Sequence, residues 1–157
     1  MDHQKSDEPK EGLAIVPEIR ELLCREFSLL AERLPVAGWP RLLEEVSAGR
    51  VYPESQALLA TGLKLVLADG RIGRLYGAHE EKALRSLFHA TDEGRRLAVA
   101  LEEVNAALQG VAGRRLERLR FTLHNPGSYR LSVQVAGVEL QLLVGSDGVR
   151  VERVLVG

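Results

Sequence analysis

The residues best suited to chemistry lie in a glycine-rich segment near the middle of the chain, Gly70–Gly77. The segment carries Arg71 and Arg74 and is followed by His79. Two guanidinium groups before a predicted helix could bind an anion, because free N–H groups and the helix dipole favour negative charge there. The spacing matches neither a P-loop nor a dinucleotide fingerprint, and two glutamates already stand in that first turn. An ordinary connection between helices is therefore favoured, with a site for a small anionic ligand or an enzyme site as the alternative.

The remaining reactive side chains form no pattern typical of catalysis or metal binding. His79 and His89 are ten positions apart, which turns them about 80° from each other on an ideal helix. They therefore share no face on which Asp92 could join them as a metal ligand. The chain has a single cysteine, Cys24, which excludes an intramolecular disulfide and cysteine-based zinc sites. Because Cys24 lies on a predicted amphipathic helix, we expect it to act as a small buried apolar residue. We expect no catalytic residue, no metal and no cofactor, so a non-enzymatic protein is favoured.

A third group of candidates consists of arginines in the last third of the chain that alternate with apolar residues. They are Arg118, Arg120, Arg130 and Arg150. Alternation places them together on the outward face of predicted strands. A basic sheet face can bind nucleic acid, but proteins that bind single strands add aromatic side chains for base stacking. This face has none, and Glu139 and Glu152 dilute its charge, so a solvated polar face is favoured.

Length and composition restrict the class of protein. The chain has 157 residues and a net charge of −1, which supplies no overall attraction to nucleic acid or anionic membranes. No apolar run is long enough to span a bilayer, and the polar first ten residues lack the apolar core of a signal peptide. We expect a cytoplasmic protein of one domain over residues 12–157, preceded by a disordered tail over residues 1–11.

The last third of the chain, which must position the arginines, is predicted to form four antiparallel strands joined by tight turns. Apolar and polar residues alternate strictly between groups of Gly, Pro, Asn and Asp. A two-residue turn at Ala136-Gly137 and a five-residue loop over 124–128 then determine the pairing. The expected pairs are Val135 with Val138, Val133 with Leu140, Leu131 with Leu142, Tyr129 with Val144, Leu123 with Tyr129, Phe121 with Leu131, and Leu119 with Val133. With this pairing both hairpins are expected to bury the same apolar face, and Val133 and Leu140 are expected to be fully buried. A slip of one residue in the pairing would turn the apolar side chains to the opposite face.

Helices are predicted before the strands, from apolar stripes and from the prolines and glycines that begin and end helices. They cover residues 17–34, 40–48, 53–68, 79–90 and 92–109. Thr91 suits the cap of the last helix, which is the nearest cover for the sheet. The expected fold class is α+β, with an N-terminal bundle of about five helices (residues 12–113) packed on one face of a C-terminal four-stranded antiparallel β-meander (residues 114–157).

The last predicted strand ends in three consecutive apolar residues, Val154, Leu155 and Val156. They cannot all face one side of a strand, although a bulge near Arg153 would restore the alternation. Because an uncovered edge promotes association, we expect a homodimer that uses these residues. We expect the chain to be a cytosolic protein-binding module, an adaptor, regulatory, immunity-type or chaperone-like partner of another protein. The alternatives are the anionic-ligand or enzyme site at Gly70–Gly77 and nucleic-acid binding through the arginine-bearing sheet face.

Overall fold

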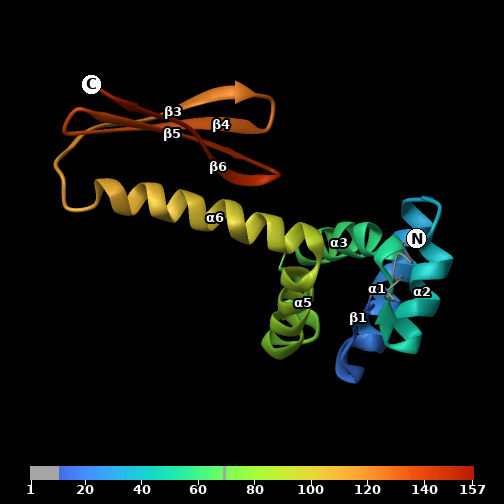
Figure 1. Cartoon of the computed structure of the whole chain (residues 1–157). Coiled ribbons are helices and arrows are strands. Elements are labelled where there is room, and N and C mark those ends of the chain that lie inside the picture. Colours follow the sequence, from blue (N-terminus) through green and yellow to red (C-terminus); the bar gives the residue numbers. More distant parts are fainter. Residues whose placement is uncertain (1–10, 69) are drawn as a thin grey trace, which may run out of the picture. The chain divides into compact units, whose positions relative to one another are not determined.

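The computed structural model describes residues 11–68 and 70–157, which form six helices and six strands (Figure 1). The α+β class is confirmed. By their contacts the residues divide into two compact units, one ending at Gly94 and one running from Arg95 to Gly157. Residues 1–10 of the predicted disordered tail lie outside the described residues. The single domain over residues 12–157 stays a prediction.

The first unit is mainly helical. Its helices are α1 (Pro17–Arg33), α2 (Trp39–Ala48), α3 (Pro53–Leu67), α4 (Arg71–Leu75) and α5 (Ala78–Ala90). Prolines occupy the first positions of α1 and α3, where the missing N–H has no intrahelical partner to lose. Two short strands, β1 (Leu13–Ala14) and β2 (Arg50–Val51), pair antiparallel. They were not predicted, because two residues are too few to show an alternation.

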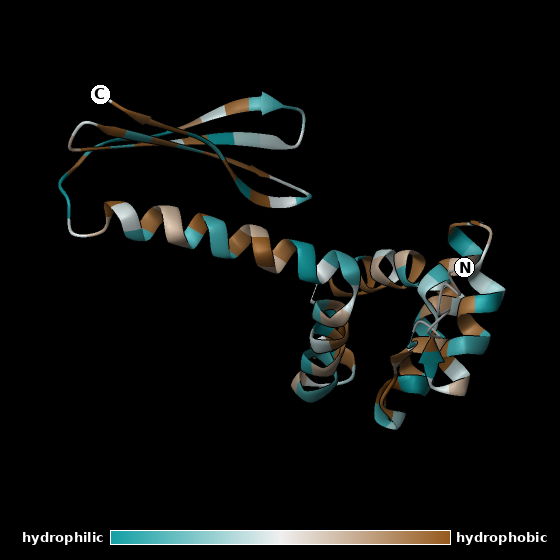
Figure 2. Ribbon diagram, in the orientation of Figure 1, coloured by the Kyte–Doolittle hydropathy of each residue, from teal (hydrophilic) through white to brown (hydrophobic). Residues whose placement is uncertain are grey.

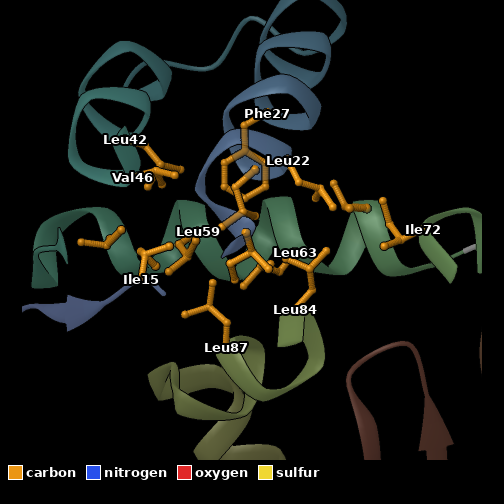
Figure 3. Close-up of a cluster of buried hydrophobic side chains, with 14 of the residues drawn as sticks. Ile15, Leu22, Phe27, Leu42, Val46, Leu59, Leu63, Ile72, Leu84 and Leu87 are labelled. Atoms are coloured by element: carbon orange, nitrogen blue, oxygen red, sulfur yellow. The ribbon is translucent and has the colours of Figure 1, made fainter. Parts of the chain in front are cut away.

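The core of this unit gathers around α3, as the apolar run in its sequence indicates (Figure 3). Leu59 and Leu63 of α3 and Phe27 of α1 are fully buried. The close approach of α1 to α3 requires Gly62, because a Cβ at that position would lie 2.8 Å from the Phe27 ring. Trp39 stacks obliquely on Phe27 with ring centroids 5.6 Å apart, and its indole N–H donates to the Leu34 carbonyl at 2.9 Å.

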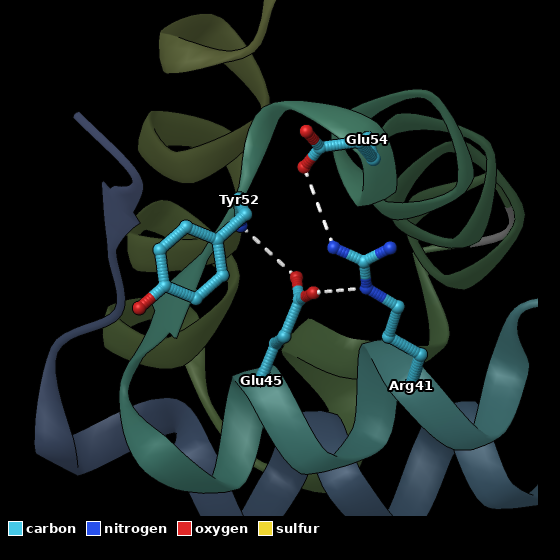
Figure 4. A network of polar contacts seen from close by, with 4 residues as sticks. All are labelled: Arg41, Glu45, Tyr52 and Glu54. Carbon is cyan, nitrogen blue, oxygen red and sulfur yellow. Dashed lines mark hydrogen bonds and ion pairs between the residues drawn. The ribbon is translucent and has the colours of Figure 1, made fainter. Parts of the chain in front are cut away.

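A buried carboxylate joins α2 to the start of α3 (Figure 4). Glu45 is only 8% exposed and accepts hydrogen bonds from the Tyr52 backbone N–H at 2.9 Å and from Arg41 Nε at 2.8 Å. Arg41 also reaches Glu54 at 3.4 Å. Desolvation alone would raise the pKa of Glu45, but these hydrogen bonds, with one from Ser55, hold that pKa below its usual value. Glu45 therefore remains charged although it is buried.

The second unit consists of most of one long helix and a sheet. Helix α6 (Asp92–Val111) begins where the Gly94 N–H donates to Thr91 Oγ1 at 3.1 Å, which confirms the predicted cap. The strands are β3 (Leu116–Asn125), β4 (Ser128–Val135), β5 (Val138–Gly145) and β6 (Gly148–Val156). Their order in the sheet is β3-β4-β5-β6, a plain antiparallel meander.

The strand register matches every predicted pair, from Leu119 with Val133 to Tyr129 with Val144. The turn between β4 and β5 has two residues, Ala136 and Gly137, with φ values of 44° and 78°. Positive φ at both positions is typical of the tight turn whose twist suits a hairpin, although alanine adopts it at a cost. The predicted bulge is present in β6. Leu142 pairs with Val151 and Gln141 pairs with Arg153, so Glu152 between them has no partner residue on β5.

A second core lies between α6 and one face of the sheet. Val104 of α6 is buried against strand residues, as the prediction that α6 covers the sheet requires. The buried strand residues are Val133, Val135, Leu140 and Leu142. Figure 2 shows apolar and polar residues alternating along α6, in keeping with one covered face. The burial of Val133 and Leu140 is confirmed, whereas the expectation that both hairpins bury this face is wrong for β3, whose apolar side chains stay exposed.

Candidate functional site

The glycine-rich segment is a structural element of the helical unit rather than an open loop. It forms α4, whose Ile72 is fully buried in the core, so the connection between α3 and α5 contains a short helix that was not predicted. Arg71 pairs with the buried carboxylate of Glu26 on α1 through its Nη2 atom. The Tyr76 hydroxyl donates to the other oxygen of Glu26 at 2.8 Å. A ligand that recruited Arg71 would therefore have to compete with a carboxylate that is only 2% exposed.

The other two residues predicted with Arg71 are both exposed to solvent. Arg74 is exposed at the end of α4, and His79 is exposed in the first turn of α5. His89 lies at the other end of α5 beside Phe88, with ring centroids 6.1 Å apart. No group of three His, Cys, Asp or Glu side chains in residues 11–68 and 70–157 could hold a metal ion.

Cys24 has the surroundings expected of a structural cysteine. It is half-buried on α1 and packs against the helical core. Burial raises the pKa of its thiol above the usual value, which keeps it protonated and weakly nucleophilic at neutral pH.

A polar hollow lies on the face of the sheet opposite α6. Its volume is about 270 Å³, and residues of β3, β4 and β5 line it. These residues are Arg118, Arg120, Thr122, Arg130, Ser132, Gln134, Glu139 and Gln141. Guanidinium, hydroxyl and amide donors together suit an oxyanion. Three of the four arginines predicted to share this face therefore meet around one concavity, and Arg150 is not among its lining residues.

The charge in the hollow is only partly free to meet a ligand. Arg130 is held by both oxygens of Glu152, at 2.6 Å and 2.9 Å, and this hydrogen bonding lowers the pKa of Glu152. Arg118 and Arg120 form no ion pair with any described residue, so they are the available cations. The lining includes no aromatic side chain, which leaves the hollow without the stacking platform of single-strand readers.

The covered face of the sheet is apolar beyond the area that α6 covers. We call its exposed part the β3 apolar surface, defined by Leu119, Phe121 and Leu123 of β3 and Tyr129 of β4. The three β3 side chains are 57%, 60% and 68% exposed, and Tyr129 is 48% exposed. The core under α6 includes residues of β4, β5 and β6 and none of β3. Four large apolar side chains on a core-forming face therefore remain uncovered.

Geometry explains why one helix leaves this strip uncovered. A helix with its side chains is about 10–12 Å wide, whereas the axes of the outer strands in a four-stranded sheet are about 14 Å apart. The apolar face and the single covering helix are both visible in the sequence, and their widths differ by several ångströms. That comparison is the signal that could have identified the β3 apolar surface.

The C-terminal residues predicted as an interface are also exposed. Val154 pairs with Leu140 of β5 and Val156 pairs with Val138 of β5. Leu155 pairs with Glu139 and lies on the polar face of the sheet. Their exposed fractions are 53% for Val154, 42% for Leu155 and 80% for Val156. The homodimer through these residues stays a prediction.

In the described part of the chain, no helix has the length and apolar character needed to cross a bilayer. Comparison of this chain with known protein families, with curated proteins and with solved structures finds no match.

Proposed function

We propose that this chain is a non-enzymatic, cytosolic protein-binding module, an adaptor, regulatory, immunity-type or chaperone-like partner of another protein, and that the β3 apolar surface is its docking surface. The observation that carries the proposal is the exposure of Leu119, Phe121, Leu123 and Tyr129 on a face that elsewhere forms a core. Exposed clusters of large apolar side chains are typical of interaction surfaces. Aromatic residues such as Phe121 are also frequent anchors of binding energy.

The chemistry of the other candidate positions supports a binding role over an enzymatic one. Arg71 already pairs with Glu26, and burial keeps the Cys24 thiol protonated. The partner expected at the β3 apolar surface presents apolar side chains of its own, because charged groups would lose hydration there without compensation.

The test is site-specific photo-crosslinking in the native host. A photoreactive side chain at position 121 should give a discrete adduct with a polypeptide other than this chain, identified by its mass. The matched control places the same group at Gln134, which is exposed on the opposite face of the sheet. An absence of adduct at positions 121 and 123, or the same adduct from position 134, would contradict the proposal.

A second candidate function, binding of a nucleic acid through its phosphates, is favoured by the two available cations that line the polar hollow. Arg118→Gln with Arg120→Gln should then reduce retention on heparin and flatten its salt dependence. Arg25→Gln with Arg33→Gln, two exposed changes on α1, makes the same change in charge and is the control. Equal losses in both double variants would show a general charge effect and remove this candidate.

A further inference from the structure

The sheet has two free edges, β3 and β6, and they differ in how well they could accept another strand. In β6 the bulge at Glu152 interrupts the edge near its middle. In β3 the pairing is regular from Arg118 to Leu123, and irregularities occur only outside that stretch. Bulges hinder edge-to-edge association, whereas a long regular edge invites it. The β3 edge is therefore the better template for strand addition.

The backbone groups available at this edge follow from the hairpin geometry. The two-residue turn makes Val135 and Val138 a hydrogen-bonded pair, so odd-numbered residues of β4 bond to β5 and even-numbered ones bond to β3. The bond from the Gly157 N–H to the Gly137 carbonyl, 2.8 Å long, fits the same alternation continued to β6. It follows that Leu119, Phe121 and Leu123 direct their N–H and C=O groups to the free edge.

We infer that β3 pairs antiparallel with β3 of a second copy of this chain around a two-fold axis at Phe121, forming a continuous eight-stranded sheet. In this register Phe121 stands opposite Phe121 of the second copy, and Leu119 stands opposite Leu123. All three apolar rows meet on one face, and about six backbone hydrogen bonds form between the copies.

Repulsion between arginines disfavours the symmetric registers whose two-fold axis lies on the N-terminal side of Phe121. An axis at Arg120 would set Arg120 against its own copy, and an axis at Leu119 would set Arg118 against Arg120. Like charges directly opposite each other are destabilising. With the axis at Phe121, Arg120 stands opposite Thr122, and no arginine opposes another.

Loss of apolar pairs disfavours the symmetric registers whose two-fold axis lies on the C-terminal side of Phe121. An axis at Thr122 would place Leu119 opposite Asn125, and an axis at Leu123 would place it beyond the end of β3. Each shift loses an apolar row. The register centred on Phe121 is therefore the one that both the charges and the apolar side chains favour.

Pairing would enlarge the apolar surface rather than consume it. Strand addition joins two β3 apolar surfaces edge to edge. The two then form one continuous apolar surface on the sheet, between the α6 helices of the two copies. The exposed residues Leu101 and Leu108 lie about 60° and 40° around α6 from Val104, so they border the stripe that meets the sheet. Because the pairing uses the surface assigned to partner binding, it rests on the proposed function.

The experiment measures the mass of the full chain in solution by light scattering at micromolar concentration. We expect twice the chain mass of 17.3 kDa. Phe121→Lys and Phe121→Glu should each be monomeric, because each places two like charges together at the axis. An equimolar mixture of the two should recover the dimer, since unlike charges then meet. A monomeric wild type, or a mixture that stays monomeric, would overturn the inference.

The control is Val154→Lys with Val156→Lys at the β6 edge, which should leave the dimer intact. Dissociation of this variant while Phe121→Lys remains dimeric would assign the interface to β6 and overturn the inference. Hydrogen exchange of the wild type needs no variant to fold: the N–H groups of Leu119, Phe121 and Leu123 should gain protection as concentration rises. Protection that does not change with concentration would also count against the pairing.

The two proposals fail separately. A photo-adduct at position 121 with a different polypeptide, together with a monomeric wild type, would retain the proposed function and remove the dimer. An adduct containing only copies of this chain would retain the dimer and remove the proposed partner.

Discussion

Glu45 shows at the level of a single residue how a buried carboxylate is kept charged, and the buried Glu26 has a similar set of partners. Each lies in the helical unit with an arginine and a tyrosine as partners, the backbone N–H of Tyr52 for Glu45 and the Tyr76 hydroxyl for Glu26. A buried carboxylate without such donors would be protonated or would unfold its surroundings. Both therefore act as connections between elements: Glu45 joins α2 to the start of α3, and Glu26 joins α1 to α4.

Glu45→Gln should lower the free energy of unfolding at pH 7 by about 1–2 kcal/mol, because hydrogen bonds to a charged group are lost. The pKa of Glu45 is lowered in the folded state, so its stabilisation is present above the unfolded pKa of about 4.3 and is lost as pH falls through the folded pKa. Denaturant titrations should therefore show the two proteins converging as the pH falls below the unfolded pKa.

The matched control for this change is Glu44→Gln, at the exposed neighbouring position on α2. We expect it to change the stability at pH 7 by less than about 0.5 kcal/mol. A Glu45→Gln variant as stable as wild type at pH 7, or a difference that grows on acidification, would refute the role given to the Glu45 charge.

At the level of elements, the regular strands and long helices could be predicted because their signals are local. The register between β4 and β5 follows from period-two alternation and a two-residue turn, and the structure agrees pair by pair. Helices α1 and α3 begin at prolines and carry long apolar stripes. Even the bulge at Glu152 was visible as a break in the alternation.

The elements that were missed depend on contacts between distant residues. Helix α4 has only five residues and is held by the burial of Ile72 and by Arg71, whose partner Glu26 is 45 positions away in the sequence. The polar hollow likewise combines three strands. A single sequence names the residues in such sites but does not show which of them meet, so the contact between Arg71 and Glu26 was not predicted.

Two glycines inside helices should respond in opposite directions to alanine. Gly62→Ala should destabilise the chain by about 1–3 kcal/mol, because its Cβ would overlap the Phe27 ring in a packed core. Gly110→Ala in α6 meets no atom within 4 Å and should stabilise by up to about 1 kcal/mol through helix propensity. Thermal melts of both variants against wild type would decide; stabilisation of both would mean that α1 and α3 do not approach as described.

At the level of the whole molecule, the two units have separate cores, because the two buried clusters share no residue. Val104→Asp should open the core between α6 and the sheet, because it buries an unpaired charge. The core around Leu59 and Leu63 contains no residue of that unit, so amides of α3 should keep their protection from hydrogen exchange. Val99→Asp, the same change at a position of α6 that is 55% exposed, should leave both units protected.

Loss of protection in both units of the Val104→Asp variant would indicate one cooperative domain, as the sequence analysis predicted for residues 12–157. Retained protection in both would place Val104 outside a core. Protection lost only in the sheet and the adjoining part of α6 is the result that separate cores require.

The position of Trp39 gives the protein a built-in spectroscopic reporter. It is the single tryptophan of the chain, and it is 3% exposed in the helical unit, against Phe27. Excited at 295 nm, the protein should therefore emit a signal that follows the helical unit alone, with the sheet silent. Far-ultraviolet circular dichroism follows both units. If the two traces of one denaturant titration coincide, the chain unfolds as one body, and if they separate, the emission curve gives the stability of the helical unit without any labelling.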